Sequence, residues 1–250
     1  MTERRDGVQV LSRAALLLRE LSVAPEGLTP IALADRVGLP RSTCYRIAGA
    51  LCQEGFMRLA PSGRLHIGAG LISIAAAGRR ELRHEAAPFL RRLSLELHET
   101  VELVVLDGDE ALFIDQYVPQ RSLRVVAEVG DRFPLYCTAC GKAILAELPD
   151  DEAERLIPDP LQPLTGHTIV DRRALLREID AARTAGVAFD RQEHTLGVSA
   201  VGAAVQDQGG SMAAITVAMP AARLEGRESC IAAALLSTRD DIQKAVAHAG

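Results

Sequence analysis

Aromatic residues are scarce in this chain, which has no Trp and only 3% Phe, Trp and Tyr together. Its interior must therefore be built from Leu, Val, Ile and Ala. No apolar run reaches the roughly 18 residues that a membrane-spanning helix needs, and the charged N-terminus does not resemble a secretion signal. The 5 cysteines are few and unevenly spaced. We therefore expect reduced thiols, a cytoplasmic location and no membrane partner.

The chain does contain enough apolar residues for a core, and its charge is unevenly distributed. A hydrophobic content of 48% argues against disorder, and 250 residues suffice for one large domain or two modest ones. The first 83 residues hold 12 Arg and 7 acidic residues, a net charge of +5, whereas the remainder carries −10. A basic first third on an acidic body is typical of a nucleic-acid-binding domain joined to a non-binding one.

Three helices are predicted in the basic third. Apolar residues at helical spacing indicate a helix with a broad buried face within residues 8–23. Thr29-Pro30 is typical of an N-cap followed by the first helical position, and Gly38 of a helix end, so a short second helix lies between them. A third helix begins near Pro40, and its apolar stripe consists of Cys44, Ile47, Ala48 and Leu51. Two short helices that meet at a tight turn containing Gly indicate a helix-turn-helix.

A β-hairpin follows these helices. Residues 56–60 and 64–67 have strand character and flank the turn signal Pro61-Ser62-Gly63. Three helices and a hairpin make a winged helix-turn-helix. The polar side chains of the third helix suit contacts with base edges and phosphates, and those of the hairpin suit flanking DNA backbone. The predicted DNA-binding residues are Arg41, Ser42, Thr43, Tyr45 and Arg46 on the helix, and Arg58 and Arg64 on the wing. An ordinary amphipathic surface helix and a solvated hairpin are the alternatives.

Here the sequence resembles the IclR family of bacterial transcription regulators. The resemblance begins with Leu39-Pro40-Arg41-Ser42-Thr43, Tyr45-Arg46, Glu54-Gly55-Phe56 and Leu65-His66-Ile67-Gly68, and it continues over nearly the full chain. It implies a winged helix-turn-helix domain at 1–68, a linker helix at 69–83 and a GAF-like effector-binding domain at 84–250.

The acidic remainder mixes helices with hairpin-connected strands. Strands are expected at 101–106, 111–118, 123–126, 187–190, 198–205 and 212–219. Helices are expected at 85–98, 138–148, 151–157, 171–185 and 223–248, the first of them burying Leu90, Leu93, Leu95 and Leu97. This order indicates an α+β domain on an antiparallel sheet. The predicted fold therefore has two domains, an all-α winged helix-turn-helix with a small β-wing and an α+β GAF-like effector domain.

Small residues gather where the helix at 138–148 begins. The run Tyr136–Ala143 leaves the backbone N–H groups of the first turn unshielded, and a helix N-terminus attracts anions. The resemblance implies that the amides of Ala139 and Cys140 hold the carboxylate of a small organic acid. Tight packing of the helix on a sheet also needs small residues, and the two interpretations carry comparable weight.

The resemblance also implies further effector contacts. Asp190 corresponds to an effector-contacting aspartate, although a lone aspartate at a strand end is commonly a turn or cap residue. Relatives often carry Ser-x-Ser where this chain has Thr216-Val217-Ala218, and Cys where it has Ala200. Because polar groups have become methyl groups here, we expect the pocket to prefer an aromatic or branched carboxylate over the smallest keto acids.

Cys137 and Cys140 form a C-x2-C motif, which leaves a metal- or thiol-based sensor as an alternative. Zinc would need further ligands such as Asp190 and His194, and no second C-x2-C exists. A cysteine-dependent enzyme fused to the helix-turn-helix is a more distant alternative. Ser199 has no G-x-S-x-G setting, and no phosphate-binding or Rossmann glycine pattern occurs. We predict no catalytic residue, no metal ligand and no cofactor.

The predicted function is therefore a DNA-binding transcription regulator controlled by an organic acid. The resemblance favours repression. The DNA partner is expected to be a palindromic or pseudopalindromic double-stranded operator, because paired half-sites multiply the specificity of one recognition helix. The chain is accordingly expected to form homodimers or tetramers, with the first and linker helices as contacts.

Overall fold

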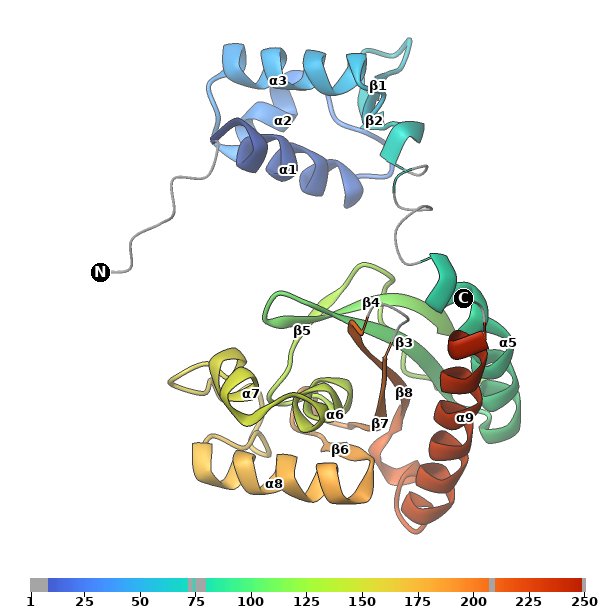
Figure 1. The fold of residues 1–250 in the computed structure, drawn as a ribbon. Coiled ribbons are helices and arrows are strands. Elements are labelled where there is room, and N and C mark those ends of the chain that lie inside the picture. Colours follow the sequence, from blue (N-terminus) through green and yellow to red (C-terminus); the bar gives the residue numbers. More distant parts are fainter. Residues whose placement is uncertain (1–8, 72–73, 75–79, 207–209, 249–250) are drawn as a thin grey trace. The chain divides into compact units, whose positions relative to one another are not determined.

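The computed structural model describes residues 9–71, 74, 80–206 and 210–248, and the chain divides into two compact units, Met1–Arg80 and Glu81–Gly250 (Figure 1). Much of the predicted linker at 69–83 lies outside the described residues, so its helical form stays a prediction. The N-terminal unit contains α1 (Gln9–Ser22), α2 (Pro30–Val37), α3 (Arg41–Gln53), β1 (Met57–Leu59) and β2 (Leu65–Ile67).

Local sequence signals place the helices of the N-terminal unit as predicted. Thr29 caps α2, because its Oγ1 accepts a hydrogen bond from the amide of Ala32 at 3.2 Å. Gly38 ends α2 in the left-handed region, at φ 65°, where glycine carries no Cβ penalty. The stripe of α3 is buried in one cluster with Leu17 of α1 and Leu33 of α2. The antiparallel hairpin β1–β2 completes the winged helix-turn-helix.

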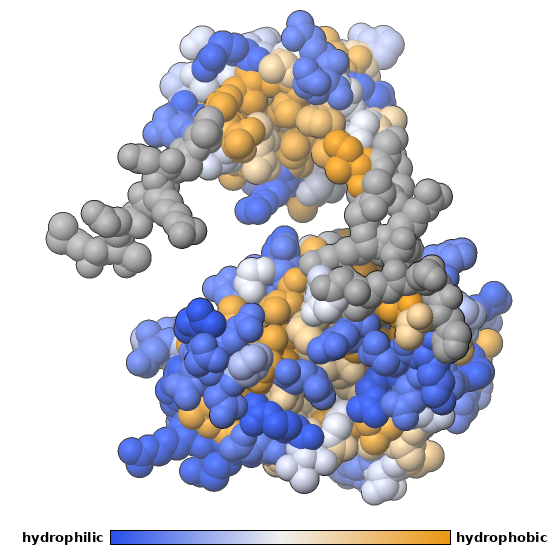
Figure 2. Space-filling model, in the orientation of Figure 1, coloured by the Kyte–Doolittle hydropathy of each residue, from blue (hydrophilic) through white to orange (hydrophobic). Residues whose placement is uncertain are grey.

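The expectation of a broad buried face on α1 was wrong. Leu17 and Leu21 are buried, but Leu11 is 68% exposed and Val10 43% exposed. Leu17 is the first fully buried residue of α1, and Ala14, one turn earlier, packs against the core only in part. Figure 2 shows that hydrophobic surface gathers on this unit, which leaves apolar side chains available for another surface.

The C-terminal unit is built on a six-stranded antiparallel sheet of order β5-β4-β3-β8-β7-β6. The strands are β3 (Thr100–Asp107), β4 (Glu110–Tyr117), β5 (Arg132–Pro134), β6 (Ala188–Arg191), β7 (Val198–Gln206) and β8 (Met212–Pro220). The helices are α5 (Arg80–Leu97), α6 (Ala139–Glu147), α7 (Asp150–Leu156), α8 (Arg172–Ala185), the short 3-10 helix η1 (Ala221–Arg223) and α9 (Glu228–His248). The predicted α+β class with an antiparallel sheet is confirmed.

Helices cover both faces of this sheet (Figure 1). Side chains alternate between the faces along each strand. Val101, Leu103 and Val105 of β3 therefore pack in the cluster that includes residues of α5 and α9. Val104 packs in the opposite cluster, which includes residues of α6 and α8. No helix among the described residues is long and apolar enough to cross a membrane.

Three local predictions in this unit were wrong. Residues 123–126 form no strand, and the edge strand is β5 instead. Leu95 is 65% exposed, because Leu90, Leu93 and Leu97 share one helix face and Leu95 does not lie on it. The closing helix begins at Glu228, not at Arg223, because η1 and a turn intervene.

Candidate functional site

A cavity of about 180 Å³ lies where the sheet meets the N-terminus of α6. Its lining includes all six residues predicted to bind an effector, Ala139, Cys140, Asp190, Ala200, Thr216 and Ala218. They come from α6, β6, β7 and β8, so the fold gathers residues that lie up to 79 positions apart in the sequence. Their role as effector contacts stays a prediction.

Small residues where α6 meets the sheet allow close packing and also line the cavity, whereas the predicted binding of a carboxylate there stays a prediction. Close packing explains Gly202, because a Cβ there would lie 2.6 Å from the carbonyl carbon of Ala139. Gly141 likewise lies against the backbone of Leu135, where a Cβ would be 2.3 Å from the nearest atom. The methyl groups of Ala139, Ala200 and Ala218, by contrast, form a small cluster and line the cavity. Glycines thus allow the close approach of α6 to the sheet, and alanines form part of the cavity wall.

Apolar and aromatic side chains form most of the remaining wall. The ring of Phe133 packs edge-on against Phe113 at 4.7 Å between centroids and stacks on His194 at 4.3 Å. Val125 and Val126, from the segment expected to be a strand, line the cavity instead. Thr100 Oγ1 donates to the carbonyl of Val125 at 2.5 Å and holds this segment beside the sheet.

Asp190 is buried at the end of β6, and its carboxylate Oδ1 accepts the amide of Glu193 at 2.7 Å. Burial, more than any charge, raises the pKa of Asp190 to about 7. Asp190 therefore has the turn role that the sequence offered and also lines the cavity, while its contact with an effector stays a prediction.

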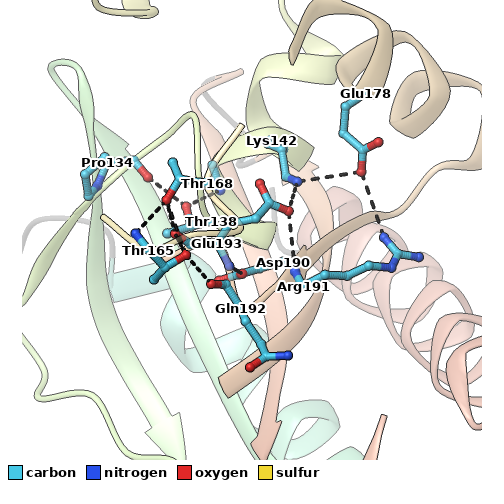
Figure 3. A network of polar contacts seen from close by, with 11 residues as sticks. Pro134, Thr138, Lys142, Thr165, Thr168, Glu178, Asp190, Arg191, Gln192 and Glu193 are labelled. Carbon is cyan, nitrogen blue, oxygen red and sulfur yellow. Dashed lines mark hydrogen bonds and ion pairs between the residues drawn. The ribbon is translucent and has the colours of Figure 1, made fainter. Parts of the chain in front are cut away.

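A polar network fixes the segment that follows Asp190 (Figure 3). The buried ammonium of Lys142 on α6 lies 2.6 Å from Oε1 of Glu193 and 3.6 Å from Oε1 of Glu178 on α8. Thr168 Oγ1 donates to the carbonyl of Glu193 at 2.6 Å, and Thr165 Oγ1 donates to the carbonyl of Gln192 at 2.7 Å. The wall that carries Asp190 and His194 is thus tied to α6, α8 and the loop before α8.

Sequence reasoning missed Glu102, which lines the cavity from β3 and is 3% exposed. Burial raises the pKa of this carboxyl to about 8. The available signal was a charged residue in the middle of the apolar run Val101–Leu106. Glu102 and Asp190 are the two carboxyl groups of the lining, and no Arg or Lys among the described residues lines the cavity.

The two cysteines of the C-x2-C motif are buried free thiols. Burial is the main cause that raises the pKa of both Cys137 and Cys140 to about 12. Thiolate is the form that reacts and binds metal, so this environment disfavours both activities. Among the described residues, no group of three or more His, Cys, Asp or Glu is placed to hold a metal ion. The geometry gives the metal- or thiol-sensor alternative no support.

The predicted DNA-binding side chains lie mostly at the surface of the N-terminal unit. Arg41, Ser42, Tyr45, Arg46, Arg58 and Arg64 are exposed, and Thr43 is half-buried. Arg41 lies 4.0 Å from Asp35, and Arg64 donates to the carbonyl of Gly27 at 2.8 Å. Within the described part of the chain, Arg46 and Arg58 have no such partner. Contact with DNA stays a prediction for all seven.

Two family descriptions match consecutive parts of the chain. The "IclR helix-turn-helix domain" matches residues 10–61, and the "Bacterial transcriptional regulator IclR C-terminal" domain matches residues 74–244. Together they cover both compact units.

Known proteins resemble the chain over most of its length. The HTH-type transcriptional regulator Rv1719 of Mycobacterium tuberculosis is 46% identical over 94% of this chain and 91% of its own length. The HTH-type transcriptional repressor AllR of Klebsiella pneumoniae is 34% identical over 87% of this chain and 82% of its own. An IclR homologue of Microbacterium hydrocarbonoxydans, solved in complex with 4-hydroxybenzoate, shares the fold with a TM-score of 0.84. That protein is 22% identical to this chain, and the match covers 95% of this chain and 99% of the other.

Proposed function

The chain belongs to the IclR family of bacterial transcriptional regulators, and from this membership we propose an operator-binding repressor that a small organic acid controls. The observation that carries the proposal is the cavity at the N-terminus of α6, in a chain that also carries a winged helix-turn-helix. Repression is supported by a relative named as a repressor.

In the DNA-binding half of the proposal, α3 enters the major groove. Arg46 is exposed beside the buried stripe of α3 and, within the described residues, engages no acidic group, so its guanidinium is available for a base edge or phosphate. Arg58 extends from the wing toward flanking backbone. The exposed apolar side chains of α1, Val10 and Leu11, support dimer formation through this helix. A dimer presents two recognition helices to a palindromic operator.

Gel retardation with DNA from the region upstream of the gene tests this half. We expect affinity to fall steeply as salt rises, and Arg46→Ala to cost roughly 1–3 kcal/mol of binding if it reads a base. Arg19→Ala, which removes an exposed arginine of α1, is the matched control and should change binding little. Equal binding by the Arg46 variant and the parent protein would contradict the assignment of α3.

In the effector half, the amides at the start of α6 receive a carboxylate, and the apolar wall receives the rest of the acid. An apolar cavity of roughly 150 Å³ accommodates benzene, so a cavity of about 180 Å³ suits a single ring or a branched chain. The methyl groups of Ala200 and Ala218 favour that apolar body over a keto acid. Because a protein of the same fold was solved with 4-hydroxybenzoate, benzoate-type acids are suitable first probes.

Calorimetric titration of the full chain tests this half. We expect benzoate-type or branched acids to bind more tightly than glyoxylate and pyruvate, and the bound acid to release operator DNA. Tighter binding of glyoxylate or pyruvate would refute the proposed preference. Tighter operator binding in the presence of the acid would refute its role as an inducer of a repressor.

A further inference from the structure

A row of polar side chains crosses the cavity side of the sheet next to the cluster of Ala139, Ala200 and Ala218. Glu102 on β3 is the register partner of Gln116 on β4 and of Thr216 on β8. Thr216 Oγ1 and Gln116 Oε1 are buried without a hydrogen-bond partner in the described structure. The carboxyl of Glu102 also has no hydrogen-bond partner within the described residues, and Glu102 is only 3% exposed to solvent. Native proteins rarely leave several neighbouring buried polar groups unmatched, so this row points to an absent partner.

The chemistry of the row specifies what that partner must carry. An amide oxygen only accepts hydrogen bonds, and a hydroxyl can accept as well as donate. The carboxyl of Glu102, whose pKa is raised to about 8 by burial, keeps an acceptor oxygen whether or not it carries its proton. The lining holds two carboxyl groups and no Arg or Lys among the described residues. The end of the cavity at Glu102 therefore offers a bound molecule acceptors, whereas the end at α6 offers the backbone amides of Ala139 and Cys140. An acid anchored at α6 whose carboxylate is its one polar group would bring no hydrogen-bond donor to the end of the cavity at Glu102.

The row lies within reach of a ligand anchored at α6. Gly202, which lies under the first turn of α6, is the register partner of Thr216, and Thr216 is the partner of Glu102. Two strand spacings, about 10 Å, therefore separate the backbone under α6 from the backbone of Glu102. The glutamate side chain shortens this gap to a distance that one substituted ring spans.

We propose that Glu102 selects the effector, and that the effector is a ring-sized acid that also carries a hydrogen-bond donor, a hydroxyl or an amino group, directed at Glu102. The proposal rests on the proposed function, because it takes the cavity to be the effector site. The carboxylate binds the amides of Ala139 and Cys140, the ring lies against the apolar wall, and the donor satisfies Glu102 and Thr216, the two members of the row that line the cavity. The raised pKa of Glu102, about 8, is that of a buried carboxyl whose charge nothing in the lining compensates.

Titration calorimetry on the full chain tests the proposal with one series of compounds. The series is benzoate, the 3- and 4-hydroxybenzoates, the 3- and 4-aminobenzoates, the 3- and 4-methoxybenzoates, and benzylamine. We expect the best hydroxy or amino compound to bind at least roughly tenfold more tightly than benzoate and its methoxy analogue, which lacks the donor. Benzylamine, which lacks the carboxylate, should bind more weakly than the best donor-bearing acid.

Variants of the row localise the effect. Glu102→Leu should reduce the advantage of the donor to less than about threefold, while Glu102→Gln, which keeps an acceptor oxygen, should retain most of it. Glu96→Leu removes an exposed carboxyl of α5 and should leave the series unchanged. Thr216→Val probes the neighbouring hydroxyl and should weaken binding of the donor compounds.

Each of the following results would contradict one part of the proposal. Equal binding of benzoate and the donor compounds, or an undiminished advantage in Glu102→Leu, would overturn the selection by Glu102. Tighter binding of benzylamine would overturn the carboxylate end of the pose. If no compound binds while operator retardation persists, the effector assignment of this cavity falls and the DNA-binding half of the proposed function stands.

Discussion

The ammonium group of Lys142 lies 2.6 Å from Oε1 of Glu193, and both side chains are buried. Lys142 comes from the first turns of α6, and Glu193 follows Asp190 in the wall of the cavity. The pair thus joins α6 to the segment that follows Asp190, and both α6 and Asp190 contribute to the lining of the cavity.

Breaking this pair is expected to be costly. Lys142→Met leaves the carboxylate of Glu193 buried without its main partner, and we expect a loss of about 3–5 kcal/mol in the free energy of unfolding. Urea unfolding measures it, and Lys244→Met, which removes an exposed lysine of α9, is the control. The double variant Lys142→Met/Glu193→Leu should recover much of the loss. A loss below about 1 kcal/mol in Lys142→Met would show that the pair does not hold the wall.

Gly202 is predicted to tolerate no side chain. A Cβ there would lie 2.6 Å from the carbonyl carbon and oxygen of Ala139, so Gly202→Ala must push the first turn of α6 away from the sheet. We expect a loss of roughly 1–3 kcal/mol in stability and weaker binding of any acid anchored at that turn. Gly166→Ala is the matched control, because its Cβ meets nothing within 4 Å. Unchanged stability of the Gly202 variant would contradict the close approach.

The stability of the C-terminal unit should depend on pH through Glu102. Its pKa is about 8 in the folded chain, above an ordinary value of 4.5, so the folded state retains a proton that the unfolded chain releases. The carboxyl therefore favours the folded state fully below about pH 4.5, and this contribution is lost as pH rises toward 8. Asp190, with its pKa raised to about 7, acts in the same direction.

Glu102→Gln removes the titration at this position and isolates its effect. The unfolding free energy of the variant relative to the parent should rise between pH 5 and about pH 8 and level off above it, as measured by urea unfolding at several pH values. Glu96→Gln, at an exposed carboxyl, should show no such trend. A difference between Glu102→Gln and the parent that stays constant with pH would contradict the buried, uncompensated carboxyl.

The elements that sequence reasoning placed correctly are those whose signals are local. Thr29 and Gly38 delimit α2 by capping chemistry, and the stripe Cys44, Ile47, Ala48 and Leu51 follows from helical periodicity alone. The predictions that were wrong concern segments whose structure depends on contacts between distant residues. Nothing in residues 123–126 shows that they cover a cavity instead of joining the sheet.

Part of the candidate site could be predicted from the sequence because the chain resembles a known family. Ala139 and Asp190 were selected because they match a family pattern, and the structure places them on one cavity, which no local pattern indicates. Glu102 was missed because alternation along β3 decides which face it occupies, while its burial depends on α6 and on residues 123–127 packing over that face. A charged residue in an apolar strand is the one sequence signal that pointed to it.

Replacing Arg46 and replacing Arg64 are predicted to have different effects on operator binding and on the stability of the N-terminal unit. Arg64 donates to the carbonyl of Gly27 at 2.8 Å and so ties the wing to the turn before α2, where Leu28 and Leu65 also pair. Arg64→Ala should therefore loosen the N-terminal unit by about 0.5–1.5 kcal/mol, seen as faster hydrogen exchange of the Leu28 and Leu65 amides in the full chain. Arg46→Ala should leave that exchange unchanged and weaken operator binding, because within the described residues its side chain engages no other group. If Arg64→Ala weakened operator binding with exchange unaltered, its guanidinium would act on DNA directly, and the pairing of Leu28 with Leu65 would suffice to hold the wing.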